Sequence, residues 1–183
     1  MEHLSHDQMT ALLKTARSHS ERDYLMGVLA YRHGLRATEV CRLKVSQFDC
    51  TSGEVLLDVQ RLKGSLRTVQ PLFPEEREAV LRWISGKQPS EYLFPGKKPG
   101  THLTRQMFFL LFRSYCKETG IIPAHLSHPH VAKHSLAMHV IQRAGIENTR
   151  TYLGHKNLQS TAHYLKADDA TASRAVAAAM VGL

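Results

Sequence analysis

The pattern of apolar and polar positions along the chain predicts a mainly helical protein. Through most of the sequence, apolar residues recur at intervals of three and four, the spacing that places them on one face of an α-helix. Gly34 and Gly120 each follow such a stretch, and glycine commonly ends a helix. We predict helices over residues 7–19, 22–34, 37–44, 74–85, 103–120, 129–144, 147–153, 158–163 and 168–183.

Residues 53–60 and 65–72 have a different character, because they are short, rich in β-branched residues and partly alternating. The sequence "RLKGS" at residues 61–65 lies between them and is typical of a hairpin turn. The Gly- and Pro-rich residues 86–102 predict a loop. The expected fold class is therefore α+β, mainly α with a small antiparallel β-sheet.

The length of 183 residues and an apolar share of 43% fit a single domain, residues 1–183, with a real core. No apolar run approaches the roughly 18 residues that span a bilayer, and the start of the chain lacks a signal-peptide pattern. Cys41, Cys50 and Cys116 are odd in number and form no CxxC pair. We expect reduced thiols in a cytoplasmic protein, without a membrane partner.

The formal net charge of +8 and a pI near 9.6 favour a polyanionic partner, most commonly nucleic acid. A basic protein without such a partner is the alternative that charge alone leaves open. The placement of the cations adds weight, because they gather in two parts of the chain: Arg36, Arg42, Lys44, Arg61, Lys63 and Arg67, and then Lys97, Lys98 and Arg105.

Two cations stand in suggestive local patterns. In "GLRATEV", Arg36 follows a glycine that ends a helix, and Glu39 is spaced to hold its guanidinium. In the "RLKGS" turn, Lys63 stands at a hairpin tip, from which an ammonium can reach a bound ligand. Each alone is more simply an ordinary surface residue.

The stretch "SHPHVAKHSLAMH", residues 127–139, holds four histidines and a lysine. Pro129 suits the first turn of a helix, so His130 stands at a helix N-terminus, where free N–H groups favour a phosphate. His130, Lys133 and His134 share one helical face. A metal site is the weaker interpretation, because no acidic residue lies between Glu118 and Glu147 to support one.

In "YLGHKNLQSTAHYL", His155 follows a Leu-Gly pair and Tyr164 comes nine residues later. A helix–turn–helix with a core tyrosine is the simpler interpretation of this stretch alone. Together with the other motifs, however, these residues form a set suited to metal-free phosphoryl transfer: cations that stabilise phosphate oxygens, an ammonium that protonates a leaving oxygen, and a phenol as nucleophile. The set is Arg36, Lys63, His130, Lys133, His155 and Tyr164.

The order and spacing of these motifs resemble the tyrosine recombinase (phage integrase) family, from about residue 4 to residue 170. The family's arginine turn, hairpin lysine, "HxxR" helix start, "LGH" and later tyrosine match "GLRATE", Lys63, "HVAK", "LGH" and Tyr164. The chain looks most similar to the short fimbrial phase-switch recombinases, which lack a separate N-terminal core-binding domain. The resemblance implies the integrase catalytic-domain fold and site-specific recombination of DNA through a 3′-phosphotyrosyl intermediate, with no cofactor.

By this resemblance, Tyr164 is the nucleophile and Lys63 the general acid. The phosphate is held by Arg36, Lys133 and His155; His130 assists proton transfer or phosphate binding, and Glu39 and His134 support the others. One departure is evident, since Lys133 stands where the family has a second arginine and lacks the bidentate guanidinium fork. The rival interpretation is therefore a DNA-binding regulator that kept the fold and lost useful catalysis.

The resemblance also implies partners. We expect duplex DNA as substrate and a homo-oligomer, a tetramer on paired DNA sites, with accessory DNA-bending proteins as further partners. Residues 170–183 end in apolar positions and are predicted to dock on a neighbouring subunit. Inversion, integration and excision all remain open as the outcome of the reaction.

Overall fold

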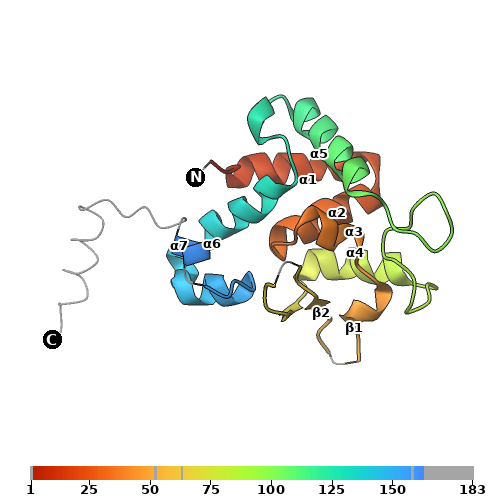
Figure 1. The fold of residues 1–183 in the computed structure, drawn as a ribbon. Helices are drawn as coiled ribbons and strands as arrows, with labels where there is room; N and C mark the ends of the chain where they lie inside the picture. The colour runs from red at the N-terminus through yellow and green to blue at the C-terminus, as the bar shows by residue number, and fades with distance from the viewer. Residues whose placement is uncertain (1, 52, 63, 158, 163–183) are drawn as a thin grey trace, which may run out of the picture.

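In the computed structural model, which describes residues 2–51, 53–62, 64–157 and 159–162, most of the longer helices gather around α2 (Glu21–Arg32) (Figure 1). Its sequence is apolar on almost every side, and Leu25, Met26 and Leu29 are fully buried, as expected for a helix at the centre of a domain. The helices that contact it are α1 (His6–His19), α3 (Ala37–Cys41), α4 (Pro74–Ile84), α5 (Arg105–Thr119) and α6 (His130–Tyr152).

The ends of the helices follow the signals in the sequence. Ser5 accepts a hydrogen bond from the backbone of Gln8 and so caps α1. Pro74 is the first residue of α4, as predicted, and two glutamates follow it at the positive end of the helix dipole. Gly120 ends α5 in the left-handed conformation, with φ of 69°.

The sheet has three antiparallel strands in the order β1 (Phe48–Asp49), β2 (Leu56–Val59) and β3 (Thr68–Pro71) (Figure 1). The predicted pair of strands corresponds to β2 and β3, and the predicted fold class, mainly α with a small antiparallel sheet, is confirmed. The third strand was not predicted, because a two-residue strand leaves no alternating pattern in the sequence.

Two predicted helices, 129–144 and 147–153, form the single element α6, with a non-helical Gly145 (φ 78°, ψ 165°) at the expected break. The predicted helix 37–44 is too long, because it ends at Cys41. A four-residue helix, α7 (Gln159–Ala162), lies within the predicted 158–163. The predicted helix 168–183, and the tail 170–183 with it, lies outside the described residues.

No helix in the part of the chain that the structure describes has the length and apolar character needed to cross a membrane.

Candidate active site

Two glycines bring the "GLR" and "LGH" motifs together. Gly34, after α2, has φ of +57°, and a Cβ there would collide with Leu153 at the end of α6. Gly154 has φ of +67°, and a Cβ there would collide with the carbonyl of Leu66. The Leu66 N–H donates a hydrogen bond of 2.8 Å to the Gly154 carbonyl. The turn before α3, the segment between β2 and β3, and the end of α6 therefore meet at one place.

Arg36 is fixed by Glu39 at the start of α3. Its backbone N–H and its guanidinium donate 2.8 Å hydrogen bonds to the two carboxylate oxygens. Burial alone would raise the pKa of Glu39, but N–H donors from Leu62 and Arg36 and the Arg36 guanidinium outweigh it, and this pKa is lowered. The Glu39 side chain is 2% exposed and that of Arg36 is 27% exposed. The buried Glu39 carboxylate therefore holds the Arg36 guanidinium in a partly solvent-exposed position.

Arg61 holds the same region together from inside, a role that sequence reasoning missed. Its guanidinium is buried and donates hydrogen bonds to the carbonyls of Gly34 (2.8 Å), His33 (2.9 Å) and Tyr152 (3.0 Å). It also lies 3.6 Å from Glu39. The sequence showed only one cation among several, and nothing in its local pattern indicates burial.

Lys133 lies in the interior beside these groups. The residue is 3% exposed, and its Nζ has no hydrogen-bond partner among the described residues. Burial and then the charges of Arg61 and Arg36 lower its pKa to about 7, against the opposing effect of Glu39. The structure therefore places Lys133 near Arg36 as a buried amine with no described partner, although we expected it from the sequence to hold the phosphate directly.

Three histidines complete the surroundings of Lys133. His155 is 8% exposed, its Nδ1 lies 3.0 Å from the Thr161 hydroxyl, and burial together with the Lys133 and Arg36 charges lowers its pKa to about 4. His130 is exposed at the start of α6, and burial followed by the His128 and Lys133 charges lowers its pKa. The His134 ring packs edge-on against His130, and burial and His130 lower its pKa to about 4.

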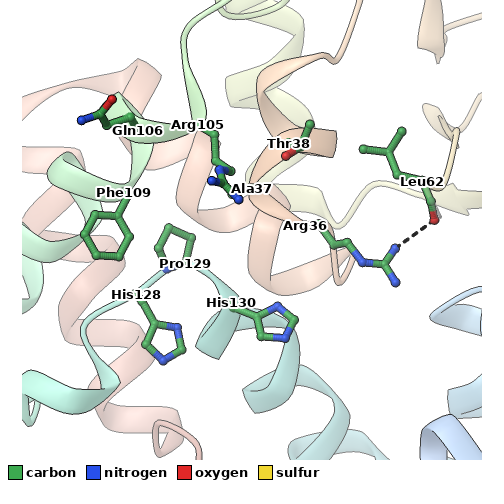
Figure 2. Close-up of a pocket in the computed structure, with 10 residues that line it drawn as sticks. All are labelled: Arg36, Ala37, Thr38, Leu62, Arg105, Gln106, Phe109, His128, Pro129 and His130. Atoms are coloured by element: carbon green, nitrogen blue, oxygen red, sulfur yellow. Dashed lines mark hydrogen bonds between the residues drawn. The ribbon is translucent and has the colours of Figure 1, made fainter.

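A pocket of about 700 Å³ opens in front of this group (Figure 2). Arg36, which directly precedes α3, and His130 of α6 line it together with Gln106 and Phe109 of α5 (Figure 2). None of its described lining residues carries a carboxylate: they are Arg36, Ala37, Thr38, Leu62, Arg105, Gln106, Phe109, His128, Pro129 and His130. The pocket is therefore suited to an anion. Lys133 and His155 are not among the residues that line it.

Two predicted site residues, Lys63 and Tyr164, lie outside the described residues. The neighbour of Lys63 in the chain, Leu62, lines the pocket, and Thr161, three positions before Tyr164, contacts His155. Tyr152 is a described tyrosine close to Arg61. Its hydroxyl donates to the Arg32 carbonyl at 2.9 Å, and burial raises its pKa, so Tyr152 is poorly suited to act as a nucleophile.

The histidines do not form a metal centre in the described parts of the chain. No group of three or more His, Cys, Asp or Glu side chains there is placed to hold an ion. His130 and His134 stand side by side without a third such ligand.

Comparison with known proteins agrees with this geometry. Residues 2–171 match the phage integrase family. The chain is 32% identical over 170 residues to the type 1 fimbriae regulatory protein FimB of Escherichia coli (strain K12), covering 88% of this chain and 82% of FimB. It is 30% identical over 176 residues to the tyrosine recombinase XerC of Erythrobacter litoralis (strain HTCC2594), covering 91% of this chain and 56% of XerC.

The fold is that of a solved recombinase. The crystal structure of the XerH site-specific recombinase bound to its difH substrate superposes with a TM-score of 0.81 at 20% identity, over 95% of this chain and 53% of that one. The predicted integrase catalytic-domain fold and the predicted resemblance to the fimbrial proteins are confirmed. The chain belongs to the phage integrase family, and it is a tyrosine-type site-specific DNA recombinase.

Proposed function

We propose that this recombinase cleaves and rejoins duplex DNA with Tyr164 as its nucleophile. The phenol gives its proton to His130 as its oxygen attacks the phosphorus, a tyrosyl–phosphate bond forms at the 3′ side, and the bond from phosphorus to the 5′ oxygen breaks. Lys63 donates a proton to the departing 5′ oxygen. Religation runs these steps backwards with a 5′ hydroxyl from another strand, so that the link to protein conserves the bond energy and no cofactor is consumed.

The observation that carries the proposal is the gathering of basic side chains at and beside a pocket without described acidic lining. Arg36 is anchored by Glu39 yet partly open, and His130 lines the same pocket. Lys133 and His155 lie close enough to Arg36 for its charge to lower the pKa of each. Fixed donors of this kind stabilise the charge that grows on phosphate oxygens in the transition state. His134 packs on His130 and supports its position.

The decisive experiment uses DNA of the source locus with a nick near the exchange point, since loss of the short strand beyond the nick traps a covalent intermediate. The wild-type protein is expected to give a denaturant-resistant adduct. Tyr164→Phe removes one oxygen and should abolish the adduct while leaving DNA binding nearly intact. Tyr152→Phe is the matched control and should keep the adduct, because that hydroxyl is bound to the Arg32 carbonyl. An adduct that survives in Tyr164→Phe contradicts the assignment.

A DNA-binding regulator is the second candidate, and the buried amine of Lys133 is the observation that favours it. An arginine grips two phosphate oxygens at once, which a lysine cannot do. The same nicked DNA separates the two functions. A regulator binds the DNA and forms no adduct under any condition, whereas the recombinase forms one that depends on Tyr164.

The assembly is also a proposal. The XerH structure contains the difH substrate, and we propose that this chain likewise binds duplex DNA, in the cytoplasm, as a homo-tetramer on paired sites with accessory DNA-bending proteins. Residues 170–183 are proposed to dock on the neighbouring subunit. Deleting them should leave cleavage of a single site but stop strand exchange between paired sites. Unchanged exchange by the truncated protein contradicts this role for the tail.

A further inference from the structure

The buried amine of Lys133 has no described counter-ion. The charged and titratable groups that face it come from every element packed around it: Arg36 and Glu39 of α3, Arg61 after β2, His130 and His134 of α6, and His155 after α6. Only one of these, Glu39, is an acid. Two of the others are permanently charged guanidiniums.

Glu39 is already occupied. Its Oε1 accepts hydrogen bonds from the Arg36 guanidinium (2.8 Å) and the Leu62 N–H (2.9 Å), and its Oε2 accepts one from the Arg36 N–H (2.8 Å). The Arg61 guanidinium lies 3.6 Å from Oε2. This carboxylate is shared between two arginines, and the Nζ of Lys133 has no hydrogen-bond partner in the described parts of the chain. The charge of Glu39 acts on Lys133 less than burial and the two guanidiniums do.

An ammonium in this position is costly, since burial removes its hydration and two guanidiniums repel it. A neutral amine avoids both costs. An anion that enters the pocket changes the protonation equilibrium of Lys133. It can contact the partly exposed Arg36 guanidinium, whose charge acts on Lys133. A phosphodiester bound at Arg36 offsets that charge and favours an ammonium behind it.

We propose that above neutral pH Lys133 is mostly an unprotonated amine in the DNA-free protein and takes up a proton from solvent when a phosphodiester binds at Arg36. The proposal rests on the function proposed above for this site. In this proposal the side chain of Lys133 becomes positively charged when the substrate binds. An arginine at this position would be charged with or without substrate.

The coupling between protonation of Lys133 and DNA binding determines how DNA affinity depends on pH. If DNA promotes protonation of Lys133, protonation must strengthen DNA binding by the same factor. With one proton taken up, affinity falls by up to about tenfold for each pH unit above neutrality, until the amine of the complex also loses its proton. A permanently charged side chain gives no such dependence.

The first test uses inorganic sulfate, which binds as a phosphate analogue and does not itself titrate near neutrality. NMR of lysine-labelled protein, with the Lys133 signal assigned by its loss in Lys133→Met, should show a titration near pH 7 in chloride. At equal ionic strength in sulfate, the midpoint should rise by about one to three pH units. Arg36→Gln should raise the midpoint in chloride and remove the response to sulfate. A midpoint above pH 9 in chloride, or no shift in sulfate, overturns the proposal.

The second test measures proton uptake on DNA binding. Tyr164→Phe protein, which is expected to bind without cleaving, is titrated with source-locus duplex at pH 8 in buffers of different ionisation enthalpy. The expected uptake approaches one proton, and it should vanish when Lys133→Arg or Lys133→Met is added. Uptake that persists with Lys133→Arg assigns the proton to another group and overturns the proposal. Failure of the adduct experiment with normal proton uptake would instead remove the recombinase assignment and leave this coupling intact.

Discussion

Two buried polar clusters lie on either side of the turn between α2 and α3, and they are built in opposite ways. The paired cluster is His33, Gln70 and Glu76, between α2, β3 and α4. The cationic cluster is Arg36, Glu39, Arg61, Lys133 and His155, behind the pocket. Arg61 touches both, because it donates to the His33 carbonyl.

Within the paired cluster, almost every polar atom has a partner. The two ring nitrogens of His33 lie 2.7 Å from Gln70 Oε1 and 2.8 Å from Glu76 Oε1. The Gln70 amide nitrogen donates to the Tyr152 carbonyl, which turns its oxygen toward His33. Both ring nitrogens of His33 therefore face a side-chain oxygen, and the Glu76 carboxylate lies against Nε2. The second Glu76 oxygen makes no hydrogen bond but lies 3.6 Å from the Arg32 guanidinium.

The cationic cluster has fewer hydrogen-bond partners for its polar atoms. It holds more positive groups than its one carboxylate can balance, and Lys133 Nζ and Arg61 Nε have no hydrogen-bond partner within the described residues. Buried polar groups in proteins are normally satisfied, so an incomplete set calls for an explanation. We infer from the comparison that the paired cluster serves the stability of the fold, whereas the cationic cluster is open to completion by a ligand.

The largest expected effect comes from breaking the paired cluster. Glu76→Ala leaves a buried ring nitrogen of His33 without its partner and removes the acceptor of the Phe73 N–H. We expect the free energy of unfolding to fall by about 3–5 kcal/mol, while adduct formation per folded molecule stays at the wild-type rate. Denaturant unfolding followed by fluorescence measures the first, and the nicked-DNA reaction the second.

Glu75→Ala is the matched control for Glu76→Ala. Its exposed carboxylate also contacts Arg32, at 2.9 Å, and surface pairs contribute at most about 1 kcal/mol. Equal losses in the two variants would show that the paired cluster has no special role in stability.

The opposite result is expected from the cationic cluster. Lys133→Met replaces an unpartnered amine with an apolar side chain of similar length, so the free energy of unfolding should hold or rise. The rate of adduct formation should fall by about 10²–10³, the usual effect of removing one preorganised donor. If Lys133→Met lowers the free energy of unfolding but forms the adduct at the normal rate, the cationic cluster serves stability and not catalysis.

What the sequence predicts well is local. Arg36 and Glu39 are three residues apart, and the contact between them follows from the geometry of a helix start. The helix ends at Gly34 and Gly120 and the start at Pro74 were predicted for the same reason. A glycine or proline acts on its own backbone, so its effect needs no knowledge of distant residues.

What the sequence does not predict depends on distant contacts. Arg61 binds a carbonyl 91 positions away, and this partner leaves no trace in the spacing of residues near either end. The burial of Lys133 has the same origin, since its neighbours Arg36 and Arg61 come from other elements. The sequence therefore indicated which residues can carry charge. It did not indicate that the Lys133 amine is buried without a described hydrogen-bond partner.

A smaller effect is expected in the dependence of stability on pH. The pKa of Lys133 is about 7 in the folded protein, below its ordinary value near 10.4 in the unfolded chain. Between these values the unfolded state binds more protons, so the free energy of unfolding should rise with pH, by at most about 1.4 kcal/mol per pH unit. Lys133→Met should flatten this rise. An equal slope in both proteins would show that Lys133 does not titrate near neutrality.

The smallest effect concerns Thr161, a positioning residue that acts through His155. Its hydroxyl lies 3.0 Å from His155 Nδ1, and both residues are buried. Thr161→Val keeps the shape of the side chain and removes this hydrogen bond, which typically contributes about 0.5–1.5 kcal/mol. We expect adduct formation to slow by up to about tenfold, with DNA affinity unchanged.

Two further variants separate positioning from a loss of folding. Thr161→Ser retains the hydroxyl and should restore most of the rate, which a purely structural role of the methyl group would not explain. Thr151→Val, at an exposed threonine of α6, is the control and should leave the rate unchanged. If Thr161→Ser is as slow as Thr161→Val, the methyl group and not the hydroxyl matters. His155 would then be held by packing, as in the interior of the fold, and the cationic cluster would depend less on hydrogen bonds than its geometry indicates.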